Sequence, residues 1–426
     1  MQIGRLPPMF RGASRIAAGS IAGQGLVMLS YPLLTRLYDA AEFGLLAVFT
    51  SVVGLISIVA SAALHRAIPI PAGDLEAADL AWTALSAVAA TTVLTAAVGL
   101  AAAAPIADLL GVPQLAHYWW LIALTVFVLG TYNVLSVWMV RERSYGALGR
   151  RNLYQGIGQA AIQVGLGLLQ VRPIGLLLGL GGGRLCGLGG LLSSGGLLRQ
   201  RRPSLAKQRA TLRRYRRFPQ LSAPAALLNT AGLEFPLLLV SAFYGDAQAG
   251  LLGLADRVFS APTVVIGNAV AQAFTGESSA AIREPKGTLV PLMRDTAGRL
   301  LIIGAPPTAL VVLAGPWLFG VVFGPTWTEA GEYARILAFA YLAQFVTNPV
   351  SGVLQILERQ GYSLTWAGVR LLLTASGPAV CGLVGAPALH AIVALSVGHV
   401  VSYALMYFLC LRVAKASDNQ HRRCQG

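Results

Sequence analysis

The sequence predicts an all-α polytopic membrane protein with about 12 transmembrane helices in two six-helix bundles. The first observation is composition. Of the 426 residues 55% are hydrophobic and only 12% are charged, whereas a soluble domain carries about 25% charged residues. The second is that the apolar residues form long blocks, each of roughly the 20 residues that a helix needs to cross a bilayer. The third is that the second half of the chain approximately repeats the first.

Six apolar segments make up the predicted N-terminal bundle, residues 1–198. Arg5, Arg11 and Arg15 precede the first segment, which is long enough to span and is followed by further spans. We therefore expect an uncleaved helix and not a signal peptide. None of the segments alternates polar and apolar residues as the strands of a membrane barrel do. The six lie at roughly 16–35, 44–64, 80–104, 118–140, 152–171 and 173–198.

A strongly basic run, RQRRPSLAKQRATLRRYRRFP, occupies residues 199–219 and holds nine Lys or Arg residues and no acidic residue. With the N-terminus in the cytoplasm, 26 of the 32 Lys and Arg residues fall on the cytoplasmic side, 3 outside and 3 within spans. This bias follows the positive-inside rule and predicts that both termini are cytoplasmic. The run is then a cytoplasmic linker, with an amphipathic helix at anionic headgroups as a second interpretation. Nucleic-acid binding is disfavoured because no recognition motif accompanies the charge.

Six further apolar segments make up the predicted C-terminal bundle, residues 220–411, and a basic cytoplasmic tail follows at 412–426. These segments lie at roughly 220–243, 249–273, 298–323, 333–357, 363–384 and 387–411.

The two halves share motifs in the same order. PLLTRLYDAAEFGLL (residues 32–46) matches PLLLVSAFYGDAQAGLL (236–252), and two later pairs of short motifs follow at similar separations. This pattern indicates a duplicated six-helix unit. Because six is even, both copies enter the membrane in the same orientation, as in transporters built from parallel repeats. In such proteins the transport site is expected where the repeats meet.

Motifs for enzymatic chemistry are missing from the sequence. There is no Walker motif, and the glycine-rich stretch GLGGGRLCGLGG has neither of the spacings of nucleotide-binding loops. In the same span, Gly175, Gly179, Gly183 and Gly187 recur every four residues, which favours close helix packing. The five His residues show no metal-ligand spacing. We therefore predict no enzyme activity, no cofactor and no metal site.

Charged residues inside the apolar segments are the candidates for function, because a charge at mid-membrane is costly unless it meets a partner or an aqueous cavity. Glu234 and Arg257 lie at similar predicted depths on adjacent antiparallel spans. They are either a structural ion pair or part of a charged cavity wall, with Arg257 facing an anionic group. Asp256 lies at the same predicted depth and is an alternative ion-pair partner for Arg257.

Polar residues also recur on single helix faces. In span 8, Asn268 and Gln272 follow Arg257 at close to whole helical turns. Such stripes either line a hydrophilic path or form hydrogen bonds between helices. Span 1 carries a second stripe that includes Gln24, Tyr31 and Thr35.

Four further arginines stand out. Arg36 and Arg66 flank early spans, where they either snorkel to the interface or line the cavity. For Arg184 and Arg370 the sequence offers no interpretation.

Several stretches resemble bacterial polysaccharide and O-antigen flippases of the multidrug/oligosaccharidyl-lipid/polysaccharide exporter superfamily. They are PLLTRLYDAAEFGLLAVFTSVVG with AIPIP after it, YNVLSVWMVRERSYGALGRRNLYQ, the region 216–262, and FGPTWTEAGEYARILA. The resemblance implies a multi-pass protein of the bacterial inner membrane. It implies alternating access of two bundles, which moves an undecaprenyl-diphosphate-linked oligosaccharide to the periplasmic leaflet for surface polysaccharide synthesis, as in lipopolysaccharide O-antigen. Arg36 and Arg257 match positions that are usually basic in this family. His65 and Glu234 depart from its pattern.

Two other functions stay open at this point. One is a cation-coupled small-molecule antiporter on the same fold, with Glu234 or Asp256 as the ion site. The other is a membrane-embedded glycan polymerase or ligase, which the short external segments disfavour. The expected partners are the anionic lipid-linked oligosaccharide, membrane lipids and other polysaccharide assembly proteins, but no nucleic acid.

Overall fold

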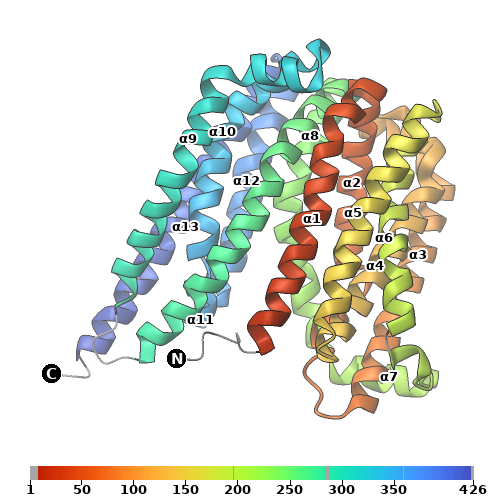
Figure 1. Ribbon diagram of the computed structural model, residues 1–426, viewed down its shortest axis with the longest axis vertical. Helices are drawn as coiled ribbons and strands as arrows, with labels where there is room; N and C mark the ends of the chain where they lie inside the picture. The colour runs from red at the N-terminus through yellow and green to blue at the C-terminus, as the bar shows by residue number, and fades with distance from the viewer. Residues whose placement is uncertain (1–7, 195, 284–287, 358, 424–426) are drawn as a thin grey trace, which may run out of the picture. The chain divides into compact units, whose positions relative to one another are not determined.

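The computed structural model describes residues 8–194, 196–283, 288–357 and 359–423 (Figure 1). Within these ranges every regular element is a helix and no strand occurs. The all-α fold class predicted from the apolar blocks is therefore confirmed.

The chain forms two compact units. Unit 1 comprises Met1–Thr230 together with Gly245–Gly250, and unit 2 comprises Ala231–Tyr244 together with Leu251–Gly426. The domain boundaries predicted from the sequence, at 198, 219 and 411, stay a prediction.

Unit 1 is a bundle of six long helices and one short one. Helix α5 packs against α1 and α6, while α4 packs against α2, α3 and α6. The short α7 lies against α3 (Figure 1). Its elements are α1 (Pro8–Leu37), α2 (Ala40–Ala60), α3 (Asp74–Leu109), α4 (Trp119–Arg141), α5 (Tyr145–Leu168), α6 (Ile174–Ser194) and α7 (Leu205–Arg214).

Helix α2 begins at a reciprocal cap. The Asp39 carboxylate accepts a hydrogen bond of 2.8 Å from the backbone N–H of Glu42, and the Glu42 carboxylate accepts one of 2.9 Å from the N–H of Asp39. Two orphan donors of the first turn are satisfied in this way. The cap fixes where the chain turns after α1.

The duplicated turns pack on each other within unit 1 through two glycines. A β-carbon at Gly44 would lie 1.8 Å from the carbonyl oxygen of Asp246, and one at Gly250 would lie 1.9 Å from that of Ala40. The two glycines are 206 positions apart in the sequence, and so are the two carbonyl residues. The contact is therefore reciprocal between equivalent positions of the repeat. Only a residue without a side chain allows backbones to approach so closely.

The basic run folds partly into α7, which binds the start of α3 through charge pairs. Lys207 lies 2.7 Å from the Asp79 carboxylate, and Arg214 lies 2.9 Å from that of Glu76. The Tyr215 hydroxyl also donates to Glu76, at 2.9 Å. Part of the positive charge of the linker is thus neutralised by acidic residues of the same unit.

Unit 2 holds α9 to α13 and the larger part of α8, whose residues Ala223–Thr230 and Gly245–Gly250 belong to unit 1. Helix α9 packs against α10, and α13 packs against α12, α10 and α9. The long α8 is interrupted at Gly245, whose φ of 86° is readily adopted only by glycine. This break falls between the predicted spans 220–243 and 249–273. The elements are α8 (Ala223–Arg283), α9 (Leu289–Phe323), α10 (Thr328–Val350), α11 (Val353–Ile356), α12 (Gln360–Leu383) and α13 (Ala388–Arg423).

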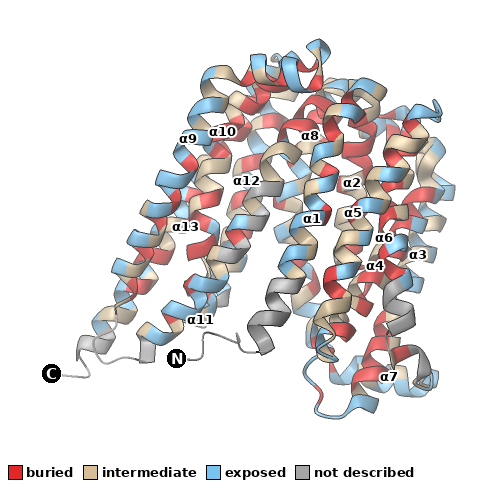
Figure 2. Cartoon of the chain, in the orientation of Figure 1, coloured by how far each residue is buried: buried red, intermediate tan, exposed pale blue. Residues whose placement is uncertain are grey.

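Exposed residues run along the length of the helices (Figure 2), and many of them are large and apolar. Leu29, Leu313 and Phe408 are each more than half exposed, as expected of residues that face acyl chains and not water. Nine helical segments of the described chain are long and apolar enough to cross a membrane. Helix α5 is not among them, and α6 contributes only a shorter apolar helix, Ile174–Gly189. A multi-pass membrane protein is therefore established, while the number of 12 spans stays a prediction.

We predict that Gly250→Ala lowers the melting temperature of the purified protein. The added methyl group cannot fit beside the Ala40 carbonyl, and overpacking of this kind costs about 1–3 kcal/mol. Thermal unfolding in detergent measures the effect. Gly25→Ala is the matched control, because no atom lies within 4 Å of a β-carbon there. Equal melting temperatures for the two variants would contradict the reciprocal contact.

Candidate functional site

A polar cavity of about 230 Å³ lies inside unit 1, where α1, α4 and α5 meet. It is unusual because the surrounding helices are predominantly apolar. Its polar lining residues are Ser20, Gln24, Tyr132, Arg151, Asn152, Gln155 and Gln159.

Glycines bring α1 and α5 together around this cavity. A β-carbon at Gly19 would lie 2.0 Å from the carbonyl oxygen of Gly149, and one at Gly156 would lie 2.2 Å from that of Gly23. The two backbones are therefore in direct contact, as in other glycine-mediated membrane helix pairs. This approach allows Asn152 Nδ2 to donate a 2.7 Å hydrogen bond across to Ser20 Oγ.

Arg151 is the centre of the polar network. Its Nε donates to Asn152 Oδ1 at 3.0 Å, and its Nη1 donates to Ser136 Oγ of α4. The guanidinium carbon lies 4.2 Å from the centre of the Tyr132 ring, within the range of a cation–π interaction. The Tyr132 hydroxyl in turn donates to Gln155 Oε1. The network fixes the guanidinium group in one orientation.

A second arginine, Arg184 of α6, lies close enough to interact electrostatically with Tyr132 and Arg151. The glycines spaced by four in α6 explain its position. A β-carbon at Gly183 would lie 2.7 Å from Gln159 Cβ, and one at Gly187 would lie 3.2 Å from Arg151 Cγ. The predicted role of this glycine series in close helix packing is thus observed against α5.

The two arginines carry positive charge that no carboxylate offsets within the described part of the chain. Arg184 donates a long hydrogen bond of 3.4 Å to the Leu180 carbonyl. Arg151 is six residues into α5 and Arg184 is ten into α6, or about 9 and 15 Å from those helix ends. Charges at such depth need an anionic partner or water to offset their desolvation. The arrangement is therefore suited to binding an anion.

The sequence places Arg151 at a cytoplasmic flank and offers no role for Arg184, so neither residue is among the predicted site residues. The missed signal is the series Arg151, Gln155, Gln159 and Gln163, which recurs every four residues. This spacing places one polar stripe along one face of α5. Residues of this α5 stripe line the cavity together with Ser20 and Gln24, which belong to the N-terminal part of the polar stripe predicted for span 1.

The span 1 residues divide into two groups. Gln24 is exposed and lines the cavity. Tyr31 and Thr35 are buried, and Thr35 Oγ1 donates to the Pro32 carbonyl at 3.2 Å. Arg36 is exposed in the last turn of α1. The predicted stripe is thus continuous with the cavity only at Ser20 and Gln24.

Among the remaining predicted residues, Arg66 is exposed in the short 3-10 turn Leu64–Ala67 that follows α2. Gln272 is exposed on α8. Asn268 belongs to the same helix, but its side chain lies outside the described residues.

In unit 2, the exposed Asp256 accepts a hydrogen bond from the Tyr341 hydroxyl of α10. The Tyr341 ring also stacks on Phe259, with ring centres 4.6 Å apart. Glu234 and Arg257 are both partly buried. Their pairing with each other stays a prediction.

Arg370, for which the sequence also offers no interpretation, is buried in unit 2. Its guanidinium carbon lies 4.6 Å from the centre of the Trp366 ring. Gly232 of α8 provides the space, since a β-carbon there would lie 3.0 Å from Arg370 Nε. This arginine therefore packs α12 against α8.

A family model described as "Polysaccharide biosynthesis protein" matches residues 33–332 of this chain. The chain belongs to that polysaccharide biosynthesis protein family. It is also 24% identical, over 383 residues, to the succinoglycan biosynthesis transport protein ExoT of Rhizobium meliloti (strain 1021). That match covers 89% of this chain and 75% of the relative.

Two solved structures share the fold. The lipid II flippase MurJ in an inward closed conformation matches with a TM-score of 0.75 and 10% identity, over 92% of this chain and 86% of MurJ. An inward-facing MATE family multidrug resistance transporter of the MOP superfamily matches with a TM-score of 0.66 and 16% identity, over 98% and 97% of the two chains. The fold expected from the resemblance noted in the sequence is thereby confirmed. These relatives are transporters and a flippase, not polymerases or ligases.

We predict that Gly156→Ala separates α1 from α5 and weakens the contact between Ser20 and Asn152. The readout is disulfide formation between cysteines introduced at these two positions in a background without the native cysteines. The pair should cross-link readily when Gly156 is retained and slowly in the Gly156→Ala variant, because the new methyl group displaces the Gly23 backbone. Gly25→Ala should leave cross-linking unchanged. Unaltered cross-linking in Gly156→Ala would refute the glycine-mediated assembly of the cavity.

Proposed function

We propose that this protein is a flippase that moves an undecaprenyl-diphosphate-linked oligosaccharide from the cytoplasmic to the periplasmic leaflet during cell-surface polysaccharide synthesis. The observation that carries the proposal is the pair Arg151 and Arg184, which lies within the helix bundle of unit 1 without a carboxylate partner in the described chain. Membership of the polysaccharide biosynthesis family and likeness to a succinoglycan transport protein support the same conclusion.

The chemistry of such a substrate fits the polar cavity. A diphosphate is a compact anion that a planar guanidinium group binds through paired N–H···O hydrogen bonds. Sugar hydroxyls can exchange hydrogen bonds with the amides of Asn152 and Gln155, and a sugar face can pack on the Tyr132 ring. The prenyl tail stays among acyl chains. The protein then has to offset only the free-energy cost of removing water from the headgroup.

The residues predicted from the sequence extend this proposal. We assign to the substrate pathway those charged and polar side chains that the sequence singles out, with Arg257 as an anion-binding residue of unit 2. The set is Arg36, Arg66, Glu234, Asp256, Arg257, Asn268 and Gln272, with Gln24, Tyr31 and Thr35 of α1. Alternating access of two like-oriented bundles is the proposed mechanism. The proposed location is the bacterial inner membrane with both termini in the cytoplasm, beside other polysaccharide assembly proteins.

One observation favours a second function. Asp256 is a carboxylate on the long helix α8 that accepts a hydrogen bond from Tyr341, and a carboxylate in a span is a suitable site for a coupling cation. The fold is shared with a multidrug transporter. A cation-coupled small-molecule antiporter is therefore the alternative, and cation-driven dye efflux in vesicles would reveal it.

Deletion of the gene tests the main proposal. We expect surface polysaccharide to be lost and lipid-linked oligosaccharide to accumulate in the cytoplasmic leaflet. Leaflet-specific labelling of the glycan in spheroplasts measures both, and the parent gene on a plasmid should restore export. Normal delivery of the lipid-linked units to the outer leaflet in the deletion strain would exclude this function.

We predict that Arg151→Gln and Arg257→Ala each reduce export in the complemented strain. A hydrogen bond to a charged group contributes about 1.5–3 kcal/mol, so loss of one guanidinium should slow transport roughly tenfold or more. Arg150→Gln is the control, because Arg150 is the exposed neighbour of Arg151. Membrane levels of each variant are compared by immunoblot. Parental export by both variants at parental protein levels would mean that neither arginine binds the substrate.

A further inference from the structure

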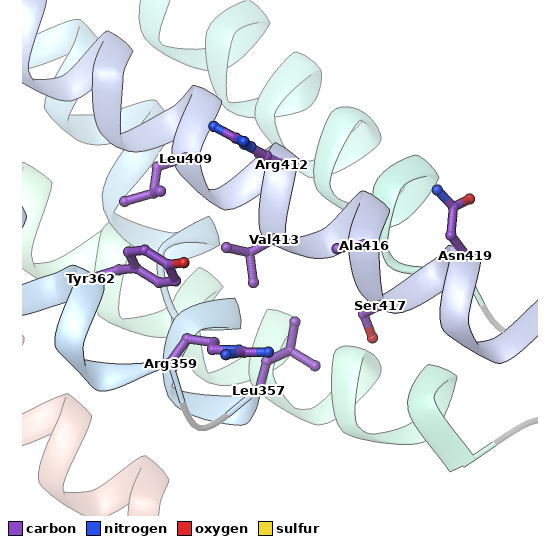
Figure 3. Close-up of a pocket in the computed structure, with 9 residues that line it drawn as sticks. All are labelled: Leu357, Arg359, Tyr362, Leu409, Arg412, Val413, Ala416, Ser417 and Asn419. Carbon is purple, nitrogen blue, oxygen red and sulfur yellow. The ribbon is translucent and has the colours of Figure 1, made fainter.

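A larger cavity, of about 550 Å³, lies at one end of unit 2, where α12 begins and α13 continues beyond its apolar stretch. Figure 3 shows Arg359 and Tyr362 on one side, facing Val413 and Ser417 of α13 on the other. Leu409 and Arg412 extend the α13 side. None of these residues belongs to the polar cavity of unit 1.

The position of this cavity along the helices is that of a lipid headgroup. The apolar run of α13 is uninterrupted by charge from Ala388 to Leu411, and Arg412 is the first charged side chain after it. Arg359 directly precedes α12. Tyr362 lies at the same level, as aromatic residues do where a membrane meets water. The cavity is therefore at the boundary between acyl chains and headgroups.

The lining combines positive charge with an apolar wall. Neither Arg359 nor Arg412 takes part in an ion pair among the described residues. The nearby Asp418 is already engaged, since its carboxylate accepts hydrogen bonds of 2.9 and 3.1 Å from the N–H groups of Leu289 and Val290. Leu357, Leu409 and Val413 supply the apolar surface. Such a lining suits an amphiphile with an anionic head better than it suits a soluble anion.

We propose that this cavity binds an anionic glycerophospholipid. Arg359 and Arg412 contact its phosphate, Tyr362 and Ser417 bind the glycerol region, and an acyl chain lies along Leu409 and Val413. Basic pockets between membrane helices hold anionic headgroups in this manner. The site is separate from substrate transport and does not depend on the proposed function.

A bound lipid would stabilise this end of unit 2. It contacts α12 and α13 at once, and a cluster of buried side chains lies in the same region. That cluster joins α13 to α8, α9, α10 and α11 and includes Phe274, Met293, Val350, Leu354, Met406 and Cys410. Lipid binding should therefore raise the melting temperature of the whole protein by mass action.

Thermal unfolding of the full chain in a neutral detergent, with dioleoyl-phosphatidylglycerol or dioleoyl-phosphatidylcholine added, tests the proposal. The variant carries Arg359→Gln and Arg412→Gln together. Lys415→Gln is the matched control, because Lys415 is exposed on the same end of α13 but does not line the cavity. We expect phosphatidylglycerol, but not phosphatidylcholine, to stabilise the parent and the control. The concentration for half-maximal effect should rise roughly thirtyfold in the double variant.

Any of three other outcomes would contradict the proposal. An equal response of the double variant and the parent would show that the lipid acts elsewhere. Equal stabilisation by inorganic phosphate would identify a site for a soluble anion. Competition for the cavity by a prenyl diphosphate at far lower concentration than phosphatidylglycerol would make it a substrate-entry site. All variants should melt like the parent without lipid, because both replaced arginines are exposed.

Discussion

A guanidinium group inside an apolar helix bundle must keep hydrogen-bond partners, because acyl chains and apolar side chains offer none. In unit 1 this constraint explains the polar residues of α4 and α5 around Arg151. Asn152 and Ser136 accept from Arg151, and the Tyr132 ring covers its face. These neutral groups accept hydrogen bonds from each guanidinium nitrogen but do not offset its positive charge. A site of this kind can bind an anion, whereas a carboxylate partner would already neutralise the positive charge.

Glycine is what allows such a site to form. Close contact between α1 and α5 brings Ser20 and Asn152 into hydrogen-bond distance, and close contact between α5 and α6 places Arg184 near Tyr132 and Arg151. The same principle acts at the duplicated turns, where Gly44 and Gly250 each pack against a backbone carbonyl. The many glycines of this chain are thus concentrated at helix contacts, where they replace the hydrophobic driving force that is missing between helices in lipid.

The fold is largely predictable from the sequence and the site is not. Apolar length predicts the helices, and turn residues such as Gly245 predict where long helices break. The sequence gives Arg151 no site role because the residue precedes the apolar run at 152–171. Helix α5 begins earlier, at Tyr145, and hydropathy alone cannot locate a helix start. Arg184 gives no signal because its partners lie on other helices. The pairing of Glu234 with Arg257 rests on spacing alone and stays a prediction.

Reconstitution tests the central claim most directly. Purified protein in liposomes is given a fluorescent prenyl-diphosphate oligosaccharide, or an analogue in which a neutral linkage replaces the diphosphate, and reduction by dithionite reports the leaflet. If cationic side chains at membrane depth carry the headgroup, the diphosphate lipid should cross and the neutral analogue should not. Equal movement of both lipids, or movement of neither above protein-free liposomes, would contradict the account.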